Sequence, residues 1–293
     1  MDEGTPEILQ VSTAKYLNLG CGGRFREDWT NIDFVSSSPF VQACDLRHGI
    51  PFPHNTFDVV YHSHVLEHFP VHKGLRFLQD CYRVLTLGGI IRVALPDLER
   101  IARMYLQALD NALQAENEWR HHYDWMMLEL YDQTVREQPG GAMLEYFKRD
   151  SIPNKAFVCE RIGREAEHMI QALRTKPSSH NGHQPLRIRN LILRVWDFPR
   201  LVQTRLVEKL LSRDDYKALE IGRFRVQGEI HQWMYDRYSL ARLLEQAGFQ
   251  NPVQRTAFES AIENWVQFCL DTEPDGSVYK PDSLYMEAVK PAA

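Results

Sequence analysis

The feature that most restricts the fold of this chain is a short apolar segment that runs directly into glycines near the N-terminus. Residues 16–23 read YLNLGCGG, which predicts a buried strand that ends in a tight turn at Gly20. Glycine leaves room for a ligand to approach the backbone closely. The turn therefore predicts a ligand site at the carboxyl end of a first strand.

Two classes of ligand use such a turn: dinucleotides and S-adenosylmethionine (SAM). The dinucleotide fingerprint GxGxxG requires a third glycine, but counting from Gly20 and Gly22 the third position is Phe25. The fingerprint also expects an acidic residue about 20 residues further on, whereas Asp33 follows Gly20 after 13. The spacing therefore disfavours NAD and favours SAM.

The first hundred residues alternate strand-like and helix-like segments. Residues 75–85 have apolar positions at helical spacing, and Gly88 and Gly89 are expected to end that helix as a C-cap. Strands that alternate with crossover segments predict a parallel α/β sheet. The segments expected to be strands are residues 17–19, 31–34, 41–44, 57–61 and 90–95.

Two aspartates follow the predicted second and third strands. Asp33 ends the second strand, where a carboxylate can accept hydrogen bonds from both hydroxyls of a ribose. Asp45 ends the third, where it can accept from an adenine amino group. Taken singly, each is equally well explained as a surface turn residue. Because ligands bind outside the carboxyl ends of the strands in open α/β sheets, the glycine turn and both aspartates are expected to face one crevice.

The chain divides by texture into three zones, which predict one α/β domain with a large helical insertion. Residues 1–97 form the N-terminal part of the α/β core, residues 98–228 the helical insertion or substrate cap, and residues 229–293 the C-terminal part of the core. A stretch rich in Pro, Ser, Asn and Gly at 177–185 predicts a loop within the insertion. The last zone returns to a helix followed by two strands.

One helical stretch of the insertion carries a dense face of aromatic and methionine side chains. Such a stripe at helical spacing is typical of a buried core, and it also suits an adaptable wall of a substrate pocket. The members of the face are Trp119, Tyr123, Trp125, Met126, Met127, Leu130 and Tyr131. On the second interpretation the substrate-binding residues would be Tyr123, Trp125, Met126 and Tyr131.

Four motifs together resemble those of class I SAM-dependent methyltransferases. They are LNLGCG at 17–22, FDVV with SHVLEH at 57–68, RVLTLGG at 83–89, and a late helix with an AGF turn at 237–249. The chain is most similar to the small-molecule, methyltransferase type 11-like group. The resemblance implies a Rossmann-like α/β fold with a mostly parallel sheet, an antiparallel last strand and a large helical insertion or cap.

The resemblance also implies a cofactor, SAM, which is converted to S-adenosyl-L-homocysteine, and no metal is expected. The chain departs from the common pattern in one place, because residues 23–30 are too few for a long helix between the glycine turn and the second strand. We expect a truncated first helix with Trp29 packed in its place. The cofactor-binding residues that the resemblance implies are Asn18, Gly20, Cys21, Gly22, Asp33, Phe34, Asp45, Leu46 and Ser63.

Three histidines follow the predicted fourth strand: His62, His64 and His68. The sulfonium methyl group is already activated, so the enzyme mainly needs to place the acceptor in line with it. A general base helps when the acceptor is a hydroxyl or a protonated amine, and histidine titrates in the right range. We predict His64 or His68 as the base and His231 as a second candidate; the alternative is that all are ordinary helix-surface histidines.

The composition of the chain limits the kinds of partner and the cellular compartment that are expected. The chain has 293 residues and a net charge of −5, so no global electrostatic attraction to nucleic acid is expected. Five cysteines without a CxxC pair argue against a zinc site and favour a reducing compartment. The sequence shows no signal peptide and no apolar run of membrane-spanning length. We expect a cytoplasmic protein without nucleic-acid or membrane partners, and a homodimer is left open.

The leading hypothesis is a SAM-dependent methyltransferase that acts on an oxygen or nitrogen of a small, partly apolar or aromatic, natural-product-like acceptor. Oxygen is preferred because histidines crowd the site. A glycan or glycolipid methyltransferase is a variant of this hypothesis. A non-catalytic SAM-binding scaffold protein is the alternative from another class, and an NAD-linked oxidoreductase comes third.

Overall fold

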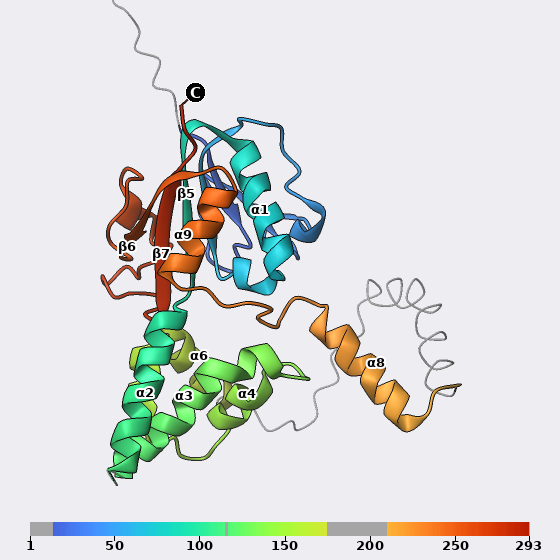
Figure 1. Cartoon of the computed structure of the whole chain (residues 1–293), viewed down its shortest axis with the longest axis vertical. Helices are drawn as coiled ribbons and strands as arrows, with labels where there is room; N and C mark the ends of the chain where they lie inside the picture. The colour runs from blue at the N-terminus through green and yellow to red at the C-terminus, as the bar shows by residue number, and fades with distance from the viewer. Residues whose placement is uncertain (1–13, 115–116, 175–209, 293) are drawn as a thin grey trace, which may run out of the picture. The chain divides into compact units, whose positions relative to one another are not determined.

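The computed structural model describes residues 14–114, 117–174 and 210–292 (Figure 1). The loop expected at 177–185 lies outside the described residues. The division of the chain into domains at residues 97 and 228 stays a prediction. By backbone contacts the chain forms two compact units: unit 1 comprises Met1–Leu106, Glu160–Gly163 and Gln232–Ala293, and unit 2 comprises Gln107–Cys159 and Arg164–His231.

Unit 1 is built on a sheet that has seven strands among the described residues, in the order β3-β2-β1-β4-β5-β7-β6. Strands β1 to β5 pair in parallel, whereas β7 runs antiparallel to both β5 and β6. This confirms the mostly parallel sheet with an antiparallel last strand. The strands are β1 (Tyr16–Leu19), β2 (Thr30–Asp33), β3 (Val41–Ala43), β4 (Phe57–Ser63), β5 (Leu85–Pro96), β6 (Gln250–Arg255) and β7 (Ser283–Val289).

Side chains alternate along the strands and divide the core of unit 1 into two faces. Val60, Ile91 and Val93 belong to a large apolar cluster that also contains buried residues of α1 (Val71–Val84) and α9 (Arg237–Gln246). Both helices lie on the same side of the sheet (Figure 1). We call this side the helix-covered face.

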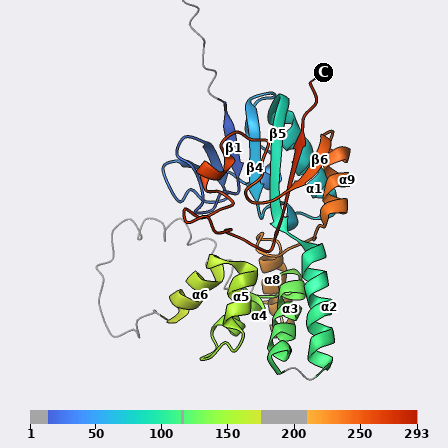
Figure 2. The same cartoon turned by 90° about the vertical axis from the view of Figure 1, so that its left-hand side faces the viewer.

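The opposite side of the sheet, which we call the loop-covered face, lies under residues 256–282 between β6 and β7 (Figure 2). This segment includes the short helix η3 (Trp265–Phe268). The rings of Trp29 and Tyr16 stack there with centroids 4.7 Å apart, and Trp29 also contacts Trp265. Residues 20–29, all of them described, contain no helix. The first helix, expected to be truncated, is absent from these residues, and Trp29 packs on this face as expected. The segment before β7 supplies cover for this face.

Helix α1 ends in a different way from the one expected. Its last residue is Val84, and Leu85 is already extended and begins β5. Gly88 and Gly89 therefore lie within the strand and do not cap the helix, which corrects the prediction. A Cβ atom on Gly89 would lie 2.9 Å from the carbonyl oxygen of Thr86 and 3.0 Å from that of Asp58. Close approach of backbones explains the glycine here.

The described part of unit 2 is helical. Trp125 and Met126 are fully buried in its core, and the Trp125 ring contacts those of Tyr146 and Phe147 at 5.3 and 5.4 Å. Among the described residues, no helix is both long and apolar enough to cross a membrane. The helices that lie partly or wholly in this unit are α2 (Leu98–Leu113), α3 (Asn117–Val135), α4 (Gly141–Phe147), α5 (Lys155–Ile162), α6 (Arg164–Arg174) and α8 (Arg213–Arg225).

Candidate active site

In the glycine turn after β1, neighbouring atoms crowd Gly20 but leave space beside Gly22. The N–H groups of Gly20 and Cys21 donate to the carbonyl of Ile32 at 2.8 and 3.1 Å, which ties the turn to β2. Gly20 has a φ of +63°, and a Cβ atom there would collide with Cγ2 of Val65. Gly22 has a φ of +55°, but nothing lies within 4 Å of the place its Cβ atom would take. The turn thus leaves space for a ligand at Gly22.

Asp33 is the last residue of β2, and its side chain is directed at this open glycine. Its Oδ2 accepts a hydrogen bond from the N–H of Gly22 at 2.7 Å. Its Oδ1 makes only a long contact of 3.5 Å with the N–H of Val35. A carboxylate has about four lone-pair sites, so Asp33 keeps capacity to accept from the hydroxyls of a ligand. Phe34, the next residue, is 60% exposed. These residues fit a ligand that carries a ribose.

Asp45 lies two residues after β3 and caps the short helix η1 (Leu46–His48). Its carboxylate accepts from the backbone N–H of Arg47 at 3.0 Å and from the guanidinium of Arg47 at 2.7 to 3.0 Å. These hydrogen bonds hold the pKa of Asp45 below its ordinary value. The turn interpretation of this residue is therefore correct, while a contact of Asp45 or of half-buried Leu46 with adenine stays a prediction.

Asn18 and Cys21 contribute structure to the turn. Asn18 is 1% exposed, and its amide donates to the carbonyl of Arg24 at 3.1 Å and to Oδ1 of Asn31 at 3.4 Å. The Asn18 side chain thus braces the turn, and a contact of the residue with a cofactor stays a prediction. Burial, with a smaller effect of the Asp33 charge, raises the pKa of the Cys21 thiol to about 11. Only the backbone of Cys21 is suited to ligand contact, and half-buried Ser63 at the end of β4 stays a predicted contact.

The histidines of the β4 region have different surroundings. His62 is fully buried, its ring contacts that of Phe77 at 5.1 Å, and burial lowers its pKa to about 4. His64 follows the strand with a φ of +55°. Its Nε2 lies 2.9 Å from Oγ of Ser283, and its Nδ1 lies 3.3 Å from Oε1 of Glu67. His64 is therefore held between two polar groups, while His62 is a neutral core residue.

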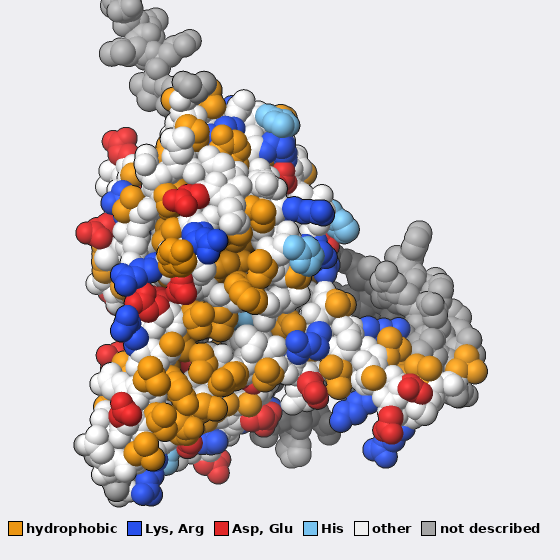
Figure 3. Space-filling view, viewed as in Figure 1, with side chains coloured by type: hydrophobic (Ala, Val, Ile, Leu, Met, Phe, Trp, Pro, Cys, Tyr) orange, Lys and Arg blue, Asp and Glu red, His pale blue; other side chains and the backbone are white. Residues whose placement is uncertain are grey.

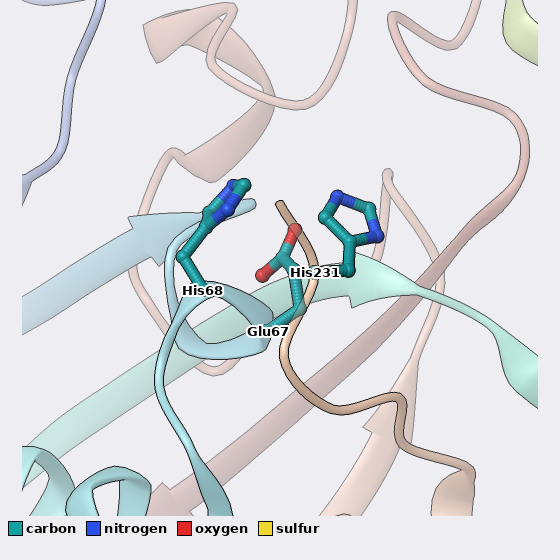
Figure 4. A group of neighbouring side chains, drawn as sticks. All are labelled: Glu67, His68 and His231. Carbon is teal, nitrogen blue, oxygen red and sulfur yellow. The ribbon is translucent and has the colours of Figure 1, made fainter. Parts of the chain in front are cut away.

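His68 is the last residue of η2 (Leu66–His68) and follows Glu67 directly (Figure 4). The Glu67 carbonyl accepts from the N–H groups of Gln232 and Trp233 at 2.7 and 3.2 Å, which anchors η2. His231 is the last residue of unit 2. Unit 1 thus contains His64, His68 and the glycine turn, and the predicted role of His231 stays a prediction.

The four predicted substrate-binding residues of α3 do not share one environment. Trp125 and Met126 are core residues with no exposed surface, and the indole N–H of Trp125 donates to Oε2 of Glu129 at 3.1 Å. This corrects the prediction that they contact a substrate. Tyr123 is half-buried and Tyr131 is 52% exposed, so for these two the contact stays a prediction.

Sequence reasoning missed a cavity of about 450 Å³ in unit 1. Its lining comes mainly from η1 and α1 and includes the basic residues Arg47, Lys73 and Arg76 and the aromatic residues Phe69 and Phe77. Figure 3 shows Lys, Arg and His side chains gathered on the side of unit 1 where α1 lies. Neither the glycine turn nor Asp33 lines this cavity, whereas Leu46, a predicted cofactor contact, does.

The strand order and the open glycine turn define a Rossmann-like methyltransferase fold. Residues 17–93 match the family model of a methyltransferase domain. The matched segment runs from β1 into β5 and contains Gly22, Asp33 and His64. Residues 17–93 are therefore similar to a methyltransferase domain, and they lie in a mostly parallel Rossmann-like sheet.

Three solved structures are similar to the chain at low sequence identity. A SAM-dependent methyltransferase from Thermotoga maritima, described as a possible histamine N-methyltransferase, is 13% identical over 96% of this chain and 84% of that chain, with a TM-score of 0.38. One from Archaeoglobus fulgidus is 10% identical over 95% of this chain and 87% of that chain, with a TM-score of 0.36. The cyclase SpnF is 21% identical over 28% of this chain and 38% of that chain, with a TM-score of 0.24.

This chain thus spans less than half of the cyclase. Similarities this weak add nothing to the assignment, which rests on the strand order and the matched domain. No curated protein matches the chain.

Proposed function

We propose that the protein transfers the methyl group of SAM to an oxygen or nitrogen of a small, partly apolar or aromatic acceptor. The observation that carries this proposal is the carboxylate of Asp33, fixed 2.7 Å from the N–H of Gly22 where the turn is open. The backbone of the turn and Asp33 would hold the cofactor at the carboxyl ends of β1 and β2. Bound there, SAM would supply an activated methyl group.

His64 is the general base in this proposal. The residue after it, Val65, abuts Gly20, so His64 lies next to the glycine turn. Its side chain is 14% exposed, which leaves it within reach of a ligand, whereas His62 is enclosed. An imidazole can take the proton of a hydroxyl or a protonated amine, and oxygen acceptors are preferred for that reason. His68 is the second candidate.

The proposal includes a cytoplasmic location and a small-molecule acceptor without nucleic-acid or membrane partners. The net charge of −5 supports the absence of a nucleic-acid partner. A glycan or glycolipid acceptor is a variant of the same chemistry. A SAM-binding scaffold without turnover is the competing class.

Thermal unfolding with SAM, S-adenosylhomocysteine and NAD tests the cofactor. A ligand at 100-fold excess over its Kd adds about 2.7 kcal/mol to the free energy of unfolding, so SAM and its product should raise Tm and NAD should not. Asp33→Ala should weaken SAM binding at least tenfold, because a hydrogen bond to a charged group contributes about 1.5–3 kcal/mol. The matched control is Asp28→Ala, since Asp28 is an exposed loop residue paired with Arg26.

A shift with NAD alone, or normal SAM binding by Asp33→Ala, would overturn the proposal. Methyl transfer to candidate hydroxyl and amine acceptors then separates an enzyme from a scaffold. Binding without any turnover would favour the scaffold.

A further inference from the structure

The two ring nitrogens of His64 lie beside different partners: one is a carboxylate, which can only accept a hydrogen bond, and the other is a hydroxyl, which can donate or accept one. Nδ1 lies 3.3 Å from a carboxylate oxygen of Glu67, and an ionised carboxylate only accepts. The negative charge beside Nδ1 therefore favours the tautomer of neutral His64 that carries its proton on Nδ1. Nε2 then has a lone pair to accept from the hydroxyl of Ser283, whose Oγ lies 2.9 Å away. The geometry selects one tautomer of His64.

Three separate elements of unit 1 bring these side chains together. His64 follows β4, and its N–H donates to the carbonyl of Ala94 in β5 at 2.8 Å. Glu67 lies in η2, and Ser283 is the first residue of β7, where it pairs with Pro96 of β5. His64 and Ser283 are 219 positions apart in the chain. Motif reading therefore could not find this arrangement, although Glu67 lies in the LEH motif.

The three residues differ in burial, and Glu67 is the most deeply enclosed. The side chains of His64 and Glu67 are 14% and 1% exposed, and Ser283 is 8% exposed as a residue. The enclosed carboxylate of Glu67 lies 3.3 Å from Nδ1 and favours a proton on that nitrogen, which leaves Nε2 with a free lone pair. The hydroxyl of Ser283 is the partner of that free nitrogen.

We propose that Glu67, His64 and Ser283 form a proton relay in which the hydroxyl of Ser283 takes the acceptor's proton and Glu67 is a positioning residue. The inference rests on the proposed function and deepens it. The acceptor O–H gives its proton to Oγ of Ser283, while Ser283 gives its own proton to Nε2 of His64. The bond from the acceptor oxygen to the methyl carbon forms as the carbon–sulfur bond breaks. The imidazolium that results faces the carboxylate of Glu67.

Other titratable groups surround the relay. Glu67 interacts electrostatically with His62 of β4 and with Tyr235. Burial lowers the pKa of His62 to about 4 and raises that of Tyr235 to about 12, so both are neutral near neutral pH. The groups adjacent to the relay along the chain or across the β5–β7 pairing are His68, Asp97 and Asp282. Because these neighbouring groups can also contribute to a pH–rate profile, the tautomer of His64 tests the relay more directly than the profile does.

The tautomer can be measured without cofactor or substrate by NMR of protein labelled with ¹⁵N-histidine. His64→Asn identifies the signals of His64 among the 12 histidines. We expect wild type to carry the proton on Nδ1, and Glu67→Gln to populate the other tautomer, because an amide can also donate to Nδ1. A proton on Nε2 in wild type would overturn the relay, whether or not the protein is a methyltransferase.

Kinetics test the Ser283 hydroxyl. Ser283→Ala should lower kcat at least tenfold with unchanged SAM affinity, and Ser283→Thr, which keeps a hydroxyl, should restore most of it. The matched control is Ser277→Ala, because Ser277 is exposed and bonds only to Asp275 among the hydrogen bonds found for its side chain. Normal turnover by Ser283→Ala would overturn the relay while leaving the proposed function intact. If SAM does not bind at all, the proposed function fails, and the NMR result still decides the network.

Discussion

The two faces of the sheet in unit 1 are held by different chemistry. The helix-covered face packs leucine, isoleucine, valine and phenylalanine side chains, such as Leu78 of α1 and Leu244 of α9, against the strands. The loop-covered face contains a buried ion network on Arg92 of β5. Its guanidinium lies 2.7 Å from carboxylate oxygens of Asp271 and Glu287, and neither acid is more than 4% exposed.

The difference follows from what covers each face. A helix satisfies its own backbone groups and can present apolar side chains. An irregular segment such as 256–282 brings unpaired carbonyls to the sheet, and Arg92 donates to those of Thr256 and Glu259 at 2.8 and 3.0 Å. The hydroxyl of Tyr61 donates to Asp271 at 2.6 Å. On the face that is covered by a loop, the guanidinium of Arg92 supplies the hydrogen-bond donors for these backbone carbonyls.

The largest expected effect is the loss of Arg92. Arg92→Met should lower the free energy of unfolding by about 3–5 kcal/mol, because it leaves two buried carboxylates without their cation. Urea denaturation followed by tryptophan fluorescence measures this, since Trp29 and Trp265 pack on the same face. The matched control is Arg255→Met: Arg255 pairs with the same Glu287 but its side chain is 31% exposed. Equal losses in the two variants would mean that burial of the network does not distinguish this face.

The helix-covered face has a weak point of its own in His62. Its pKa is lowered from 6.5 to about 4 by burial, with the charge of Glu67 acting in the opposite direction. The unfolded state therefore binds a proton more readily, so stability is complete above about pH 6.5 and is lost as the pH falls to about 4. The loss amounts to roughly 3 kcal/mol at 1.36 kcal/mol per pH unit.

His62→Phe should remove this part of the acid-induced loss, because phenylalanine suits the contact with Phe77 and does not titrate. Urea denaturation at pH 7 and pH 4.5 measures it. His54→Phe, at an exposed position, should keep the wild-type dependence on pH. An unchanged acid slope in His62→Phe would assign the loss to other groups.

A third comparison lies within the glycine turn, where one glycine rests on the helix-covered core and the other does not. Gly20→Ala forces a Cβ atom into Val65, a member of that core, and overpacking of this kind costs about 1–3 kcal/mol. Gly22→Ala meets no neighbour and has only the cost of its backbone angle, about 1–2 kcal/mol, which Gly20→Ala also has.

Urea denaturation should therefore rank Gly20→Ala below Gly22→Ala, while calorimetry shows weakened SAM binding in both. If Gly22→Ala binds SAM as tightly as wild type, the open space at Gly22 is not the cofactor site.

What the sequence could predict depends on how local the signal is. The strand that ends at Gly20, the acid at Asp33 and the missing first helix all follow from residue types and spacing within a few positions. Arg92 interrupts an apolar run, and nothing near it in the sequence indicates that its partners are Asp271 and Glu287. Ser283 shows the same limit, because its contact with His64 arises only from the pairing of β5 with β7.

The smallest expected effect concerns an ion pair at the rim of the loop-covered face. Nη1 of Arg24 lies 3.1 Å from Oε1 of Glu273, with side chains 27% and 11% exposed. Arg24 also donates to the carbonyls of Leu270 and Thr272 at 3.1 and 2.7 Å and lies over the ring of Tyr279. Glu273→Gln keeps an acceptor at this position, and partly exposed pairs contribute little, so the free energy of unfolding should change by less than about 1 kcal/mol. Urea denaturation at low and high salt measures this. If Glu273→Gln lowered the free energy of unfolding as much as Arg92→Met, the partly exposed ion pair would stabilise this face as strongly as the buried network.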